Sequence, residues 1–178
     1  MANFLSKIST SLKDFIEKQQ MFFVATADVD GRVNLSPKGL DSLRILSPNQ
    51  IIWLNYTGSG NETAAHLLGV NRMTLMFNSF EGNPLILRIY GKAKTIHTSD
   101  SEWDTYYKYF PTSPGARQIF DMTVESVQTS CGYAVPLYEY KEQRTRLVNW
   151  EKAKDKDALA EYWEEKNKIS IDGKLTGI

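Results

Sequence analysis

Cysteine and histidine are scarce in this chain, and their scarcity limits the chemistry that its side chains offer. Its 178 residues include one cysteine, Cys131, and two histidines, His66 and His97. A lone cysteine excludes an internal disulfide, and these three residues are too few for a zinc site. We therefore expect no disulfide framework and no metal centre. Cys131 is interpreted as a small buried apolar residue and not as a nucleophile.

The chain also lacks an excess of either charge and any long apolar run. It carries 21 basic and 21 acidic residues, so no long-range field favours nucleic acid or an anionic membrane. No apolar run approaches the roughly 20 residues that span a bilayer. The N-terminus has no signal-peptide core. We expect a cytoplasmic protein with neither nucleic acid nor membrane as a partner.

Length and turn spacing predict one mainly antiparallel β domain. With 42% hydrophobic residues, 178 residues can bury a sizeable core, and no linker or repeat divides the chain. Strand patterns dominate from Phe22 to Thr98, interrupted by turn signals and one short helix. We expect a single domain over residues 1–178, with a barrel core over about 20–136 and a helical extension over about 137–178.

Three helices are predicted outside this strand-rich part. The first is an amphipathic helix that packs on the core. Its apolar positions are Leu5, Ile8, Leu12, Phe15 and Ile16. The second covers Ser101 to Tyr109, with Ser99 or Asp100 as its cap, and the third covers Asp155 to Lys168.

The loop from Thr57 to Thr63 joins an apolar strand pattern, Ile51 to Tyr56, to a helical pattern, Glu62 to Leu68. Its glycines permit backbone conformations in which several N–H groups converge, and the first turn of a helix has unpaired amides. Such a loop can bind a phosphorylated small molecule. An ordinary strand-to-helix turn with Asn61 as N-cap explains it equally well. The loop matches neither the dinucleotide fingerprint nor the P-loop.

A second motif lies upstream, in a predicted hairpin. Phe22 to Ala27 and Arg32 to Ser36 read as strands joined at Asp30-Gly31. The second strand runs into Ser36-Pro37-Lys38-Gly39. Because proline lacks an N–H, we expect strand pairing to stop here and to leave Lys38 at the rim of the sheet, where it can pair with a phosphate.

Together, these segments resemble the pyridoxamine 5'-phosphate oxidase-like family of FMN-binding split barrels. The matching segments are 34–39, 56–61, the strand at 71–77 and the end of a long strand at 89–93. The match extends from Phe22 to Thr98, with a shorter one from Val127 to Val135. The resemblance implies an α+β, mainly β fold, an antiparallel split β-barrel with flanking helices.

The resemblance also implies where FMN binds. Backbone groups of the second strand would face the flavin ring, Lys38 would reach the phosphate or ribityl oxygens, and the helix start would hold the phosphate. The implied cofactor-binding residues are Asn34, Leu35, Ser36, Pro37, Lys38, Tyr56, Thr57, Ser59, Gly60, Asn61, Glu62, Thr63, Arg88, Gln128, Thr129 and Ser130.

The chain departs from the named oxidase at the helix start, where Ser-Arg-Lys is replaced by Asn61-Glu62-Thr63. Two cations are missing, and Glu62 must point away from a bound phosphate. Arg72 or Arg88 is a candidate to compensate. Arg88 is equally well explained as an outward arginine that covers apolar surface. The polar stretch before Ala134 is either the counterpart of a flavin-contacting Gln-Ser pair or a structural turn.

The C-terminal Arg-Leu-X-Pro signature of the oxidase is absent, because Arg146-Leu147 comes too early and lacks the proline. The sequence therefore does not identify the substrate. The resemblance implies a homodimer with FMN at the subunit interface. We expect an FMN-dependent oxidoreductase that acts on a small substrate, with a nicotinamide or another donor. The alternatives are a non-catalytic flavin carrier or sensor, and a haem- or deazaflavin-binding split barrel.

Overall fold

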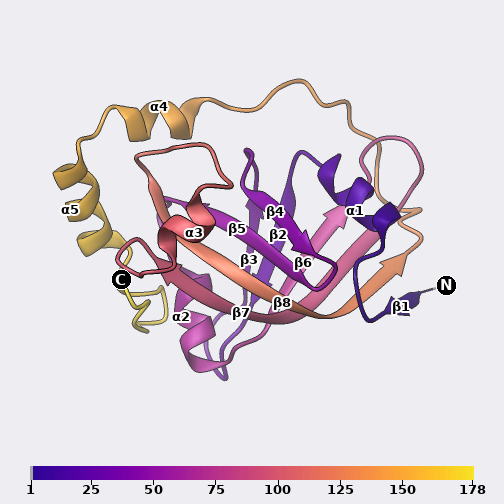
Figure 1. Cartoon of the computed structure of the whole chain (residues 1–178), viewed down its shortest axis with the longest axis horizontal. Helices are drawn as coiled ribbons and strands as arrows, with labels where there is room; N and C mark the ends of the chain where they lie inside the picture. Colours follow the sequence, from indigo (N-terminus) through magenta and orange to yellow (C-terminus); the bar gives the residue numbers. More distant parts are fainter. Residues whose placement is uncertain (1) are drawn as a thin grey trace.

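The computed structural model describes residues 2–178. Within this range the chain forms eight strands and five helices (Figure 1). The strands are β1 (Asn3–Leu5), β2 (Phe22–Thr26), β3 (Asn34–Lys38), β4 (Leu43–Ser47), β5 (Gln50–Tyr56), β6 (Met73–Asn78), β7 (Ile86–His97) and β8 (Ala116–Ser130). The helices are α1 (Thr10–Glu17), α2 (Glu62–Gly69), α3 (Trp103–Tyr107), α4 (Arg146–Lys152) and α5 (Lys156–Lys166).

One antiparallel sheet contains all of these strands, in the order β3-β2-β6-β7-β8-β5-β4, with β1 added beside β8. The long strands β7 and β8 form its centre, and Figure 1 shows α1 and α5 toward opposite ends of the molecule. The predicted mainly β class with flanking helices is confirmed. None of the helices in residues 2–178 is long and apolar enough to cross a membrane.

The core has two parts, one on each face of the central strands. The inner part contains Trp53, which stacks on Phe120 with ring centroids 4.4 Å apart. The outer part lies beneath α3 and includes Ile96 and Ile119. Because alternate residues of a strand point to opposite faces, β5 and β8 supply apolar side chains to both parts.

The predicted hairpin forms, and Gly31 has the left-handed φ of +86° that its turn requires. The expectation that pairing stops at residues 36–39 is wrong. β3 continues through Lys38, with Pro37 opposite Phe23 and Lys38 opposite Phe22. Because β3 pairs only with β2, its other edge needs no N–H from Pro37.

Several other expectations need correction. Leu5 belongs to β1 and not to the first helix, which starts at Thr10 with the Ser9 hydroxyl as its cap. The helix α3 is shorter than predicted, and its N-cap is Glu102. Cys131 is exposed and not buried.

The region after Tyr109 differs most from the sequence analysis. The local patterns do not predict β8, which extends to Ser130, so Gln128 to Ser130 lie in a strand and not in a turn. The third predicted helix is confirmed as α5, whose Asp155 carboxylate accepts a hydrogen bond from the Ala158 N–H at 2.8 Å.

Candidate functional site

Lys38 stands at the end of β3 with its side chain turned toward the barrel interior. Its Nζ lies 5.3 Å from the centroid of the Trp53 ring. Burial, together with the charge of Arg117, lowers the pKa of Lys38 to about 8. No carboxylate in residues 2–178 forms an ion pair with it. A largely buried ammonium without a counter-ion favours an anionic ligand nearby.

A groove of about 640 Å³ brings the two sequence motifs together. The Pro37–Leu40 segment forms one side, and the end of β5 with Thr57 and Gly58 forms another. The segment that leads into α4, together with the first residues of α4, closes the groove. These residues are Glu142, Gln143, Arg144, Arg146 and Leu147.

Arg144 and Arg146 are the residues that sequence reasoning missed. Both line the groove of Lys38, and Arg146 also lines an adjoining hollow with Gly58 and Ser59. Both arginines come from a segment that is distant in sequence from the helix start. The only sequence signal was the Arg-Thr-Arg spacing, which gives no hint of its position in space.

The hydroxyls and amides of the 57–63 loop are largely engaged within the protein. Thr57 Oγ1 donates to the Gly115 carbonyl oxygen and accepts from Trp163 Nε1, both at 2.9 Å. Thr63 Oγ1 accepts from Asn34 Nδ2 at 3.1 Å. The Thr57 hydroxyl therefore has its hydrogen committed within the protein, whereas the Thr63 hydroxyl accepts a bond and keeps its own hydrogen to donate. Ser59 stays exposed.

The helix start is covered by the C-terminal segment. Asn61 does not cap α2 with its side chain, which pairs with the Gln118 amide through bonds of 2.8 and 3.3 Å. Glu62 Oε1 accepts from the Ile171 N–H at 3.0 Å. Neither Gly58 nor Gly60 has a positive φ, so the special backbone freedom expected of them is not used. The loop resembles an ordinary strand-to-helix turn more than an open cradle.

Three of the remaining candidates, Arg88, Gln128 and Ser130, lie on the outer face of the sheet. Arg88 Nη1 donates to Ser130 Oγ at 3.3 Å, and the Tyr90 hydroxyl donates to Gln128 Oε1 at 2.6 Å. Thr129 pairs with the buried Leu87 and so shares the inner face. None of Arg88, Gln128 and Ser130 lines the groove of Lys38.

One row of side chains that crosses the sheet includes Pro37, which lines the groove, and the outer-face candidates Arg88 and Gln128. Registered partners in a sheet point to the same face. Pro37 and Arg88 lie in one row but three strand spacings apart, which is about 14 Å. Arg72 lines a different hollow of this outer face, beside Tyr90. The row runs through Phe4, Gln128, Arg88, Met76, Phe23 and Pro37.

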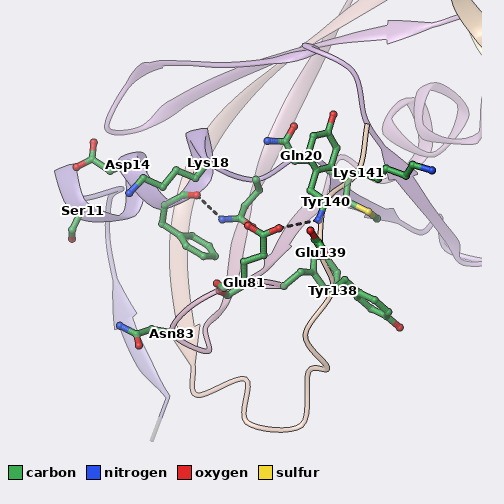
Figure 2. Close-up of a pocket in the computed structure, with 15 residues that line it drawn as sticks. Ser11, Asp14, Lys18, Gln20, Glu81, Asn83, Tyr138, Glu139, Tyr140 and Lys141 are labelled. Atoms are coloured by element: carbon green, nitrogen blue, oxygen red, sulfur yellow. Dashed lines mark hydrogen bonds between the residues drawn. The ribbon is translucent and has the colours of Figure 1, made fainter. Parts of the chain in front are cut away.

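A larger pocket of about 1040 Å³ adjoins the groove and shares Gln20, Met21 and Tyr140 with it. Figure 2 shows its walls, which are α1, the β6–β7 turn and the 138–141 segment. The N–H of Tyr140 donates to Glu81 Oε1 at 2.9 Å and fixes that segment against the turn. The walls are rich in aromatic side chains. They include Phe15, Phe80, Tyr138 and Tyr140.

Comparison with known proteins gives matches to one family. The family model for pyridoxamine 5'-phosphate oxidase matches residues 8–131. The pyridoxamine 5'-phosphate oxidase family protein ustO of Aspergillus flavus is 38% identical over 144 residues, which are 78% of this chain and 58% of that protein. The chain thus spans little more than half the length of this curated relative.

Solved structures share the fold. HupZ from Group A Streptococcus is 22% identical with a TM-score of 0.54, over 67% of this chain and 91% of that one. A candidate pyridoxamine 5'-phosphate oxidase from Lactobacillus delbrueckii is 16% identical with a TM-score of 0.54, over 69% and 94% of the two chains. By its family match and its curated relative, this chain belongs to the pyridoxamine 5'-phosphate oxidase family.

Proposed function

We propose that this protein binds FMN with its phosphate in the groove beside Lys38 and acts as an oxidoreductase. The observation that carries the proposal is the partly buried Lys38 ammonium, which has no ion-pair partner in residues 2–178 and lies in a groove lined by two arginines. An anionic group there would be stabilised by all three cations.

The residues of the groove fit the phosphorylated end of the cofactor. Arg144 and Arg146 supply the two positive charges that are missing at the helix start, and Ser59 offers an uncommitted hydroxyl in the adjoining hollow. Glu62 directs one carboxylate oxygen away to the C-terminal segment, where Oε1 accepts a hydrogen bond from the Ile171 N–H. Bound FMN would supply the redox chemistry, and the protein would bind and orient it.

The outer-face candidates contact the cofactor only if a second copy of the chain brings them there. Within one chain, Arg88 lies about three strand spacings from Pro37, and Gln128 lies about four. The same face leaves Leu35, Val33 and Phe4 exposed by 64%, 72% and 66% of their surface. Exposed apolar surface of this kind favours an isologous dimer. We propose a homodimer through this face, with FMN at the interface.

The dimer is tested by sedimentation of the purified protein. The Leu35→Glu substitution places a charge in the proposed interface and should yield a folded monomer. The control is Leu68→Glu, because Leu68 is equally exposed at 65% but lies on α2. A monomeric wild-type protein, or an unchanged dimer in Leu35→Glu, would contradict this interface.

The pocket of Figure 2 is the proposed site of the second reactant, which is a small substrate or a nicotinamide donor. It adjoins the groove through shared residues, its volume suits a small organic molecule, and its aromatic walls favour a planar ring. The substitution Phe80→Ala, remote from Lys38, should raise KM for the reactant while FMN affinity stays unchanged. A change in FMN affinity instead would place this pocket in the cofactor site.

The first experiment is the absorbance spectrum of the purified protein and of the small molecule released on denaturation. A flavin spectrum and release of FMN support the proposal, and reduction of the bound flavin by a nicotinamide at catalytic rates separates an enzyme from a carrier or sensor. A Soret band indicates haem, and a deazaflavin is identified by its own spectrum. A colourless protein that does not take up FMN contradicts the proposal.

A further inference from the structure

Arg117 is a buried cation without a partner. Its side chain lies in β8 and is 3% exposed, and its Nε and Nη1 atoms have no hydrogen-bond acceptor in the part of the chain that the structure describes. No carboxylate of residues 2–178 forms an ion pair with it. Burial lowers the pKa of Arg117 to about 10, so the guanidinium stays charged at neutral pH.

This arrangement is costly for a folded protein. Buried charges are normally paired, because the desolvation of an ion costs several kcal/mol that only a counter-ion and hydrogen bonds offset. Buried polar groups without partners are rare in native proteins. An anion from solution would supply what the chain itself does not.

A small pocket of about 110 Å³ opens beside Arg117. His97, Thr98 and Ser99 form one wall, and Trp163 with residues 177–178 forms another. None of these side chains is a carboxylate. The Trp163 indole N–H is already bonded to Thr57, so its ring serves as a wall. The polar wall adds further hydrogen-bonding groups beside the guanidinium.

His97 fits this environment as a neutral donor. Burial lowers the pKa of His97, and the nearby Asp100 partly opposes that shift. The imidazole is therefore neutral at pH 7 and carries one N–H. Asp100 is committed elsewhere, because its Oδ2 accepts a hydrogen bond from the His97 backbone N–H at 2.8 Å.

We propose that this pocket is a binding site for a small oxyanion, either inorganic phosphate or a short carboxylate, held by the guanidinium of Arg117. The fork of N–H groups matches the oxygens of both ligands. The pocket is too small for FMN, and it shares no lining residue with the groove of Lys38. The pocket is thus distinct from the groove, although the charge of Arg117 contributes to the lowered pKa of Lys38.

The test is the unfolding midpoint of the full chain in Tris chloride at constant ionic strength, with phosphate or acetate replacing chloride. We expect a saturable rise of several degrees for the wild type. Arg117→Met should have a higher midpoint than the wild type without the oxyanion and should show no rise with it, because the unpaired charge is gone. A response to phosphate alone assigns phosphate, and a response to acetate alone assigns a carboxylate.

Two further variants make the outcome specific. Arg88→Met removes an arginine from the outer face and should keep the wild-type response. Lys38→Met tests whether the response comes from the cofactor groove instead. If the response is lost in Lys38→Met and kept in Arg117→Met, the anion binds in the cofactor groove and this proposal is overturned. The absence of any response in the wild type overturns it as well.

A second measurement covers the case in which Arg117→Met does not fold. The ³¹P line width of inorganic phosphate reports its exchange with the wild-type protein directly. Arg117→Lys keeps the charge but loses the planar fork, so we expect phosphate affinity to fall about fivefold or more. Unchanged affinity in Arg117→Lys would contradict a site built on the guanidinium.

Discussion

The indole Nε1 of Trp163 donates a hydrogen bond of 2.9 Å to the hydroxyl of Thr57, which joins α5 to the loop before α2 across 106 residues of sequence. Asn167 strengthens this link by donating to the Gly58 carbonyl oxygen at 3.0 Å. The C-terminal segment is therefore part of the wall around the candidate site. Substitutions that move α5 should shift the positions of Thr57 and Gly58.

Trp163→Phe tests this link. The variant keeps an aromatic ring but loses the N–H, and we expect the free energy of unfolding to fall by about 1 kcal/mol. Urea unfolding measures the change. The control is Trp150→Phe, because Trp150 packs against Tyr162 by its ring. Equal losses in the two variants would mean that ring volume, and not the hydrogen bond to Thr57, sets the effect.

Two glycines are predicted to differ sharply in their tolerance of a side chain. A Cβ at Gly91 would meet the backbone oxygen of Thr123 at the β7–β8 bulge, far inside van der Waals contact. Gly91→Ala should destabilise the fold by about 3 kcal/mol. Gly58 has open space around its Cβ position and no positive φ, so Gly58→Ala should leave the unfolding midpoint nearly unchanged. A stable Gly91→Ala protein would contradict the register at this bulge.

Glu151 predicts a pH dependence of stability. Its side chain is fully buried in α4, Oε2 accepts a hydrogen bond of 2.6 Å from Ser113, and Oε1 has no partner among the described residues. Burial raises the pKa of Glu151, and the bond from Ser113 partly opposes this. The folded state therefore binds the proton more tightly than the unfolded state. Stability falls as pH rises above the unfolded pKa of 4.5 until the folded pKa is passed.

The neutral isostere Glu151→Gln removes this cost. We expect a higher unfolding midpoint than the wild type at pH 7 and a smaller difference near pH 4. Scanning calorimetry at both pH values checks the prediction, with the exposed Glu161→Gln as the control. A Glu151→Gln protein that is less stable at pH 7 would show that the carboxylate has a partner in solution.

Local sequence patterns predict the strands around the site well, because alternation and turn residues act over a few positions. β2, β5 and β6 all form close to their predicted bounds, and Lys38 and Tyr56 do meet in one groove. The split of the candidates between two faces could not be predicted. It depends on the register that places Arg88 opposite Met76 and Gln128, and a shift of one residue would reverse it.

The contributions of the C-terminal part were beyond sequence reasoning for a different reason. Arg144, Arg146 and Trp163 come to the site by tertiary packing, and no local spacing signals it. Pro37 led to a wrong prediction, because β3 stays paired with β2 through this residue. A proline ends strand pairing only where a neighbouring strand needs its N–H.

The lowered pKa of Lys38 predicts that FMN affinity depends on pH. Its pKa of about 8 lies below the ordinary value because burial and Arg117 disfavour the charge, and a bound phosphate would favour it. The phosphate is already a dianion above pH 7. Binding should therefore take up a proton, and FMN affinity should fall as pH rises from 7 to 9. Lys38→Met should bind weakly with little pH dependence, as measured by titration calorimetry.

The most direct measurement compares FMN with riboflavin, which has the same ring and no phosphate. Titration of the cofactor-free protein, followed by quenching of flavin fluorescence, gives both dissociation constants. We expect FMN to bind at least about tenfold more tightly than riboflavin, which corresponds to about 1.4 kcal/mol for the phosphate contacts, and this difference to disappear in Lys38→Met. Equal affinities for the two flavins in the wild type, or a full FMN preference in Lys38→Met, would contradict the proposed phosphate site.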